Sequence, residues 1–155
     1  EAFKTLLRAA SVEPEMQAAQ DSAIIASHYE PAARTANEWG VQTPLGVAML
    51  YDTNIQGGLA SCLRRAVSVA GGRVGAPASG GGLVTEAAFL RAFNDERKAR
   101  LLELANAAGN TAQGRALRTS VYRCDEFAAL LASGNLQLVG TLHVRGNDIE
   151  GLAPP

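Results

Sequence analysis

The sequence lacks most of the features that mark specialised chains. Its two cysteines, Cys62 and Cys124, are too few for a disulfide framework and have no metal-ligand spacing. One bridge or two buried thiols are both compatible with them. No apolar run approaches the roughly 18 residues that span a bilayer. The net charge of -1 gives no reason to expect a nucleic acid or an anionic membrane as partner.

Catalytic signatures of the common kinds are also missing. There is no HExxH zinc motif, and no serine or cysteine lies in a nucleophile motif. The stretch 71–82 (GGRVGAPASGGG) is rich in glycine but lacks the Gly-Lys-Ser/Thr ending of a phosphate-binding loop, so we expect a flexible surface loop. We therefore expect neither a metal nor a cofactor.

What is present is a helical pattern in a chain long enough for one domain with one sizeable core. Ala2–Ala10 has apolar residues at i, i+3, i+4 and i+7, which predicts a helix with one buried stripe. A short extended segment, Leu136–Arg145, alternates around Gly140 and predicts a hairpin. We expect about seven helices in a mainly α domain, divided as follows: Ala2–Ala10, a helix capped by Ser11 and ending near Ser27, Pro31 to Gly40, Pro44–Gln56, Leu59–Ala70, Glu86–Ala107 after a Thr85 cap, and Ala112–Ala132.

Three charged residues lie on helix faces that periodicity assigns to the core. Asp52 interrupts an apolar helix, Arg97 completes the stripe of Leu90 and Phe93, and Arg123 lies one turn before Phe127. Buried guanidinium groups need carboxylates, so we expect an Arg-Asp-Arg cluster that keeps Asp52 ionised. Such a cluster either fixes helix register or serves a site, and spacing leaves both open.

Trp39, the one tryptophan, leaves a similar choice. It is either a platform on which a sugar stacks or a core or hinge residue, and its place before a helix end favours the second.

Several short motifs together resemble glycoside hydrolase family 46, the chitosanases, and their peptidoglycan-hydrolysing relatives in the lysozyme-like superfamily. The matching pieces extend over almost the whole chain and are the following: Ala18-Ala19-Gln20-Asp21, Tyr29-Glu30-Pro31-Ala32, Tyr51-Asp52 with Gly57, Ala92-Phe93 with Asp95 and Arg97, Arg123 with Asp125, and Gly134-Asn135-Leu136 with Leu138.

The resemblance implies a lysozyme-like helical fold that cleaves β-1,4-linked amino sugars. It also implies that Asp52, Arg97 and Arg123 form a charge relay behind a catalytic glutamate, which would tune that group as a general acid. By their position at the end of the Asp52 helix, we expect Asn54, Gln56 and Gly57 to face the sugar cleft.

The sequence departs from the family in its acids. The catalytic glutamate and aspartate of the family precede the helices matched here, and Glu1 is a weak candidate for the acid because its context resembles the following helix. The chain begins without methionine or a signal-peptide pattern, so we expect residues 1–155 to be one lysozyme-like domain without its N-terminal catalytic segment.

The function expected first is therefore a muramidase-like hydrolase of peptidoglycan, acting outside the cytoplasm or delivered by a phage or secretion device. One alternative is a chitosanase acting on another β-1,4 amino-sugar polymer. The other is a non-catalytic lysozyme-like module that binds cell wall in a larger assembly. Expected partners are the polymer and the chain's own N-terminal segment or that assembly.

Overall fold

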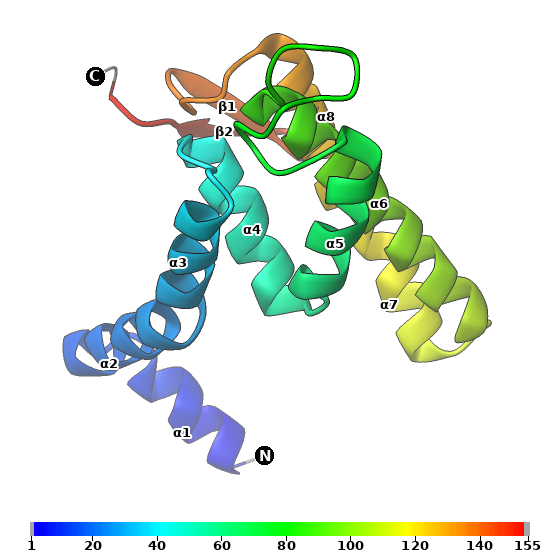
Figure 1. Cartoon of the computed structure of the whole chain (residues 1–155). Helices are drawn as coiled ribbons and strands as arrows, with labels where there is room; N and C mark the ends of the chain where they lie inside the picture. The colour runs from blue at the N-terminus through cyan, green and yellow to red at the C-terminus, as the bar shows by residue number, and fades with distance from the viewer. Residues whose placement is uncertain (1, 154–155) are drawn as a thin grey trace.

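A computed structural model describes residues 2–153, and these residues are mainly helical. Figure 1 shows the helix α4 between α3 and α5, with the long helix α6 beside α5. The elements have these bounds: α1 Ala2–Ala10, α2 Pro14–Ile24, a π-helical segment Ile25–Tyr29, α3 Glu30–Glu38, α4 Pro44–Gln56, α5 Leu59–Ala70, α6 Glu86–Ala107, α7 Ala112–Ser120, α8 Tyr122–Ser133, β1 Thr141–Val144 and β2 Asn147–Glu150. The prediction of a mainly α fold with a short extended end is confirmed.

The core lies where α4, α5, α6 and the end of α8 meet. Its fully buried side chains include Leu45, Met49, Leu50, Phe89 and Phe93. The Thr43 hydroxyl caps α4 by accepting from Gly46 N, and Glu86 accepts hydrogen bonds from the backbone and hydroxyl of Thr43. Glu86 therefore joins the first turns of α4 and α6.

The N-terminal helices form an arm that leaves the body (Figure 1). The predicted buried stripe of α1 is wrong, since Phe3 is 71% exposed and Leu6 is 66% exposed. An amphipathic pattern marks a face that can be buried, and no element among the described residues buries this one. Ser11 is not the cap of α2 either. Glu13 occupies that position, and the Ser11 hydroxyl donates to the Arg8 carbonyl.

The predicted interruption between Ser27 and Pro31 is also wrong, because the chain stays helical from Pro14 to Glu38. Pro31 has no N–H for a helical bond. The Ile25–Tyr29 segment widens to i→i−5 hydrogen bonding, with Glu30 N donating to Ile25 O. The wider turn lets the helix pass a proline without ending.

Two further boundaries near the C-terminus differ from expectation. The predicted helix Ala112–Ala132 is broken at Val121, which lets both α7 and α8 pack along α6. The hairpin turns at Arg145-Gly146 rather than at Gly140, and both turn residues have positive φ (53° and 74°). A two-residue turn of this kind matches the twist of paired strands.

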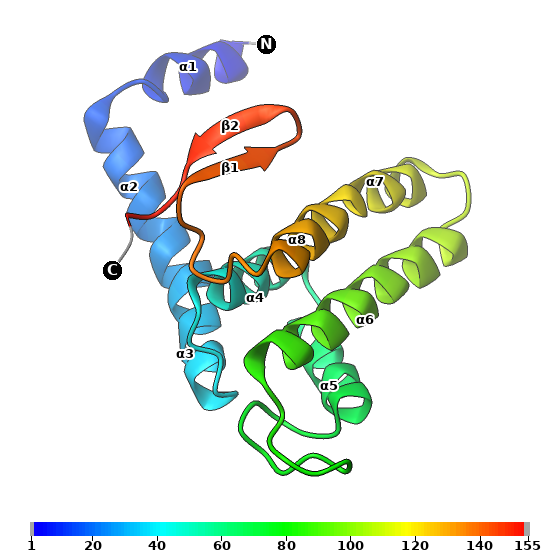
Figure 2. The same cartoon turned by 90° about the horizontal axis from the view of Figure 1, so that it is seen from above.

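The two sides of α4 carry different elements. Figure 2 shows α8 and the β1–β2 hairpin on one side of α4, with α5 and the loop after it on the other. That loop, residues 71–82, contains backbone hydrogen bonds such as Ala78 N to Gly82 O. None of the helices in the described part of the chain combines the length and the hydropathy that a membrane span requires.

Candidate functional site

Asp52, Arg97 and Arg123 come together although they are far apart in the sequence. Asp52 lies on α4, Arg97 in the middle of α6 and Arg123 in the first turn of α8. One carboxylate oxygen of Asp52 accepts from Arg97 Nη2, and the other accepts from Arg123 Nη2. The carboxylate is therefore shared by two cations, and the cluster carries one net positive charge.

Arg97 is the buried member of the cluster. Its side chain is 2% exposed, and besides Asp52 its Nη2 donates to Gln56 Oε1 at 2.6 Å. Burial lowers the pKa of the Arg97 guanidinium, although an arginine side chain stays charged in proteins. The Arg97 guanidinium also lies 5.8 Å from the centroid of the Phe127 ring. Arg97 is thus held by one carboxylate, one amide and one aromatic ring.

Arg123 is the accessible member of the cluster. Its side chain is 34% exposed, compared with 13% for Asp52. A hollow of about 180 Å³ opens beside it, lined by Asp52, Tyr122, Arg123, Glu126, Phe127, Leu130 and Val144. The net positive charge of the cluster therefore reaches the surface at Arg123.

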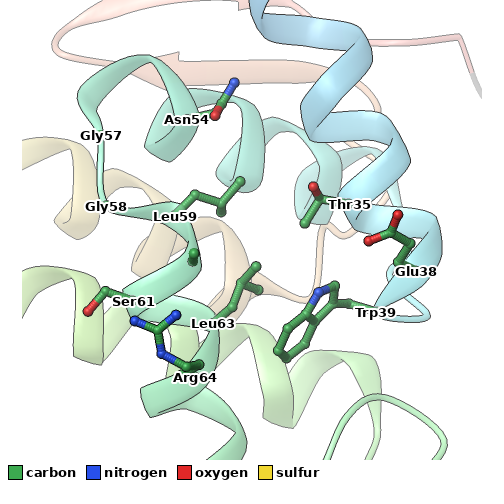
Figure 3. Close-up of a pocket in the computed structure, with 11 residues that line it drawn as sticks. Thr35, Glu38, Trp39, Asn54, Gly57, Gly58, Leu59, Ser61, Leu63 and Arg64 are labelled. Atoms are coloured by element: carbon green, nitrogen blue, oxygen red, sulfur yellow. The ribbon is translucent and has the colours of Figure 1, made fainter.

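The residues predicted to face a sugar cleft do not share one face of α4. Asn54 is rotated about 200° from Asp52 around the helix, whereas Gln56 is rotated by only about 40°. Accordingly Gln56 joins the ion-pair cluster, while Asn54 Nδ2 donates to His28 O at 3.1 Å on the other side. Asn54 and Gly57 line a separate hollow of about 510 Å³ between α3 and α5 (Figure 3). Glu1, the weak candidate for the acid, lies outside the described residues.

Trp39 lies at the edge of this second hollow. The guanidinium carbon of Arg73 is 4.3 Å from its ring centroid, and Phe89 packs against the ring with centroids 6.0 Å apart. The ring also packs on the hydrophobic core. These contacts favour the core interpretation of Trp39 over the stacking platform.

Several polar residues of this second hollow were missed by the sequence reasoning. Glu38, Ser61 and Arg64 line it, and each is an ordinary polar residue on the surface of a helix. No periodicity distinguishes such residues from solvated ones, because their place depends on how α3 and α5 flank α4.

The two cysteines are separate, buried thiols. Burial raises the pKa of the Cys62 thiol, and nearby Arg100 only partly opposes this effect. Burial likewise raises the pKa of the Cys124 thiol. Among residues 2–153, no group of three or more His, Cys, Asp and Glu side chains is arranged to hold a metal ion.

Comparison with known proteins connects this geometry to one family. The sequence model described as glycosyl hydrolase family 46 matches residues 1–142. A curated chitosanase from Bacillus subtilis (strain 168) is 29% identical over 153 residues, which is 94% of this chain and 52% of that protein. The chain therefore spans about half the length of this curated relative.

Two solved chitosanase structures resemble this chain in fold. The chitosanase GsCsn46A of Gynuella sunshinyii, in complex with chitotetraose, has a TM-score of 0.75 and 30% identity, over 90% of this chain and 57% of that one. Native chitosanase from Bacillus subtilis MY002 also has a TM-score of 0.75, with 25% identity over 97% of this chain and 63% of that one.

Proposed function

This chain belongs to glycosyl hydrolase family 46, and we propose that it forms the charged support of an acid/base site that hydrolyses chitosan, a polymer of β-1,4-linked amino sugars. The observation that carries the proposal is the sharing of one Asp52 carboxylate by a buried and an accessible arginine. The three residues are those that the family resemblance assigns to a relay behind a catalytic glutamate.

The cluster is suited to controlling the proton of a neighbouring carboxyl group. Asp52 and Gln56 anchor Arg97, and Asp52 in turn orients Arg123. A cation next to a carboxyl group favours its ionised form, so the position of Arg123 sets how readily that acid releases its proton. In glycoside hydrolysis the released proton goes to the oxygen of the leaving sugar. Asp52 and Arg97 are positioning residues in this scheme.

Chitosan is proposed over peptidoglycan because the related proteins compared above are named chitosanases. This choice follows the chitosanase alternative of the sequence analysis rather than its muramidase interpretation. We also propose that the enzyme works outside the cytoplasm, where it can reach a polymer of this size.

The test compares hydrolysis of chitosan and of peptidoglycan by the protein as it is produced, with new reducing ends as the readout. The intact mass of the purified material, compared with the 16.1 kDa of these residues, defines what is assayed. We expect reducing ends from chitosan and few from peptidoglycan.

The Arg123→Gln variant then tests the cluster. We expect kcat on chitosan to fall by about 10²-fold or more, the range of general acid catalysis. Arg123→Lys should recover part of the rate and shift the pH profile, because the charge is kept but its geometry changes. Arg34→Gln, which removes an arginine from an exposed pair with Glu30, is the matched control and should be unchanged.

Two results would overturn the proposal. Release of reducing ends from peptidoglycan in preference to chitosan would restore the muramidase interpretation. Binding of chitosan without any cleavage would favour the non-catalytic module.

A further inference from the structure

The hollow between α3 and α5 lies away from the ion-pair cluster. Its lining comes from the second half of α3, the end of α4 and the first turns of α5 (Figure 3). Asn54 reaches it from the side of α4 opposite Asp52, since the two positions differ by about 200° around the helix. Figure 2 shows α5 on one side of α4 and the hairpin on the other. A ligand here would not touch Asp52 or Arg123.

The walls of this hollow carry polar groups without partners. The carboxylate of Glu38 on α3 and the guanidinium of Arg64 on α5 form no ion pair or hydrogen bond with the described residues. The indole N–H of Trp39 likewise donates no hydrogen bond within residues 2–153. Trp39 Nε1 is accessible to solvent, so it can donate to a ligand that enters the hollow. The hollow therefore offers an acid, a base and a neutral donor to a ligand.

Apolar side chains lie beside these polar groups. Leu59 and Leu63 come from the first turns of α5, and Ser61 adds one hydroxyl between them. An apolar surface beside a few directed polar groups is the usual composition of a small-molecule site. The volume of about 510 Å³ is within the range of such sites.

We propose that this hollow is a second binding site for an amino-sugar unit, separate from the reaction site. In this site Glu38 pairs with the protonated amine, Trp39 Nε1 donates to a hydroxyl oxygen, and Leu59 contacts the apolar face of the sugar ring. The choice of a cationic sugar rests on the proposed function. Arg64, on the facing wall, opposes the ammonium charge and keeps binding weak.

A second weak site matters most for a long chain. One polymer that occupies both the hollow and the reaction site binds more tightly than either site alone, because the second contact is intramolecular. A short oligomer cannot reach both. Loss of the hollow should therefore raise KM on long chitosan and leave kcat and the hydrolysis of short oligomers unchanged.

Trp39 supplies a local signal for the binding experiment. The purified protein is titrated with the β-1,4-linked glucosamine disaccharide while the fluorescence of Trp39, the one tryptophan in the sequence, is followed. The Trp39→Phe variant has no tryptophan signal, so its Kd is measured by isothermal titration calorimetry. We expect a saturable fluorescence change in the unsubstituted protein and a higher Kd in Trp39→Phe, which lacks the indole N–H.

Two charge variants give opposite expectations. Glu38→Gln should raise Kd about two- to fivefold, and Arg64→Gln should lower it by a similar factor, as expected for one exposed charge pair. Both effects should shrink at high salt. Asp95→Asn removes an exposed carboxylate on α6 outside the hollow and is the matched control. All of these positions except Trp39 are on exposed helix surface, so the variants should fold.

Three outcomes would overturn the proposal. The first is the absence of a saturable Trp39 signal. The second is the reverse order of the two charge variants, which would identify an anionic ligand. The third is a loss of short-oligomer hydrolysis in Glu38→Gln as large as in Arg123→Gln, which would make the hollow part of the reaction site.

The titration tests the second binding site and the cleavage assay tests the proposed function, so either claim can be refuted without the other. Saturable binding with the expected order of Kd values, in a protein that does not cleave chitosan, would refute the proposed function and support this site.

Discussion

Asp52→Asn should destabilise the protein strongly, because Arg97 depends on that carboxylate. The Arg97 side chain is 2% exposed, and its other hydrogen-bond partner is the neutral amide of Gln56. Nε and Nη1 of Arg97 are buried without a partner among the described residues. Asparagine keeps the shape of Asp52 but leaves a buried cation without a counter-charge.

The magnitude follows from this burial. Breaking a buried ion pair by removing one partner costs about 3–5 kcal/mol. A domain of this size has a total stability of roughly 5–15 kcal/mol. For about 150 residues each kcal/mol shifts Tm by roughly 2–4 °C, so we expect a fall of about 6–20 °C. Arg123 contributes little to this loss, since it is 34% exposed and can be solvated by water.

The assay is urea unfolding followed by far-ultraviolet circular dichroism, together with the double variant Asp52→Asn/Arg97→Met. Replacing a buried ion pair by neutral groups of similar volume is often neutral or stabilising. The double variant should therefore recover most of the free energy of unfolding lost in the single one.

A loss in Asp52→Asn below about 1 kcal/mol, the level of an exposed pair, would refute the reasoning. A double variant no more stable than the single one would refute it as well, because Arg97 would then not be the source of the cost.

Three further predictions concern the scaffold. Thr43→Ala should cost about 0.5–2 kcal/mol through the lost α4 cap, whereas Thr43→Ser should keep most of that stability, as urea midpoints will report. Gly114→Ala should lower the free energy of unfolding more than Gly109→Ala, because a Cβ at Gly114 would lie 2.1 Å from Gly109 O while a Cβ at Gly109 meets nothing within 4 Å. The Gly109 substitution should cost about 1–2 kcal/mol for its positive φ. Equal shifts of Tm in the two variants would contradict this order. Burial raises the pKa of the Cys62 and Cys124 thiols, so both should react with a thiol reagent only after unfolding. The free energy of unfolding should fall as pH rises above the ordinary thiol pKa, because the thiols of the unfolded chain ionise first. Rapid labelling of the folded protein at neutral pH would contradict the burial.

Local patterns in the sequence predicted most of the helices. The ranges 44–56, 59–70 and 86–107 agree with α4, α5 and α6, because proline, glycine and threonine caps act within one turn. The break at Val121 and the π-helical segment Ile25–Tyr29 were not predicted. The break depends on packing against α6, and the π-helical segment on a rearranged hydrogen-bond pattern that Pro31 permits but does not require.

Periodicity also found the charged cluster, for a physical reason. A charge at a core position of a helix must be paired, so Asp52 on one helix implies a buried cation, and Arg97 and Arg123 on two others imply a buried carboxylate. Periodicity also predicted a buried face for α1, and this prediction was wrong. Phe3 and Leu6 on that face are exposed within the described residues. A pattern shows that a face can be buried, and only tertiary contacts decide whether it is.

The sequence by itself thus determined the bounds of α4, α5 and α6, the Thr85 cap of α6 and the three residues whose charges needed each other. Tertiary structure alone decided that Gln56 faces Arg97 while Asn54 faces the opposite side, and that Glu38, Trp39 and Arg64 line one hollow. Residues on separate helices meet only through the angles at which those helices pack. Those angles come from the fit of many side chains at once, so no local stretch of sequence encodes them.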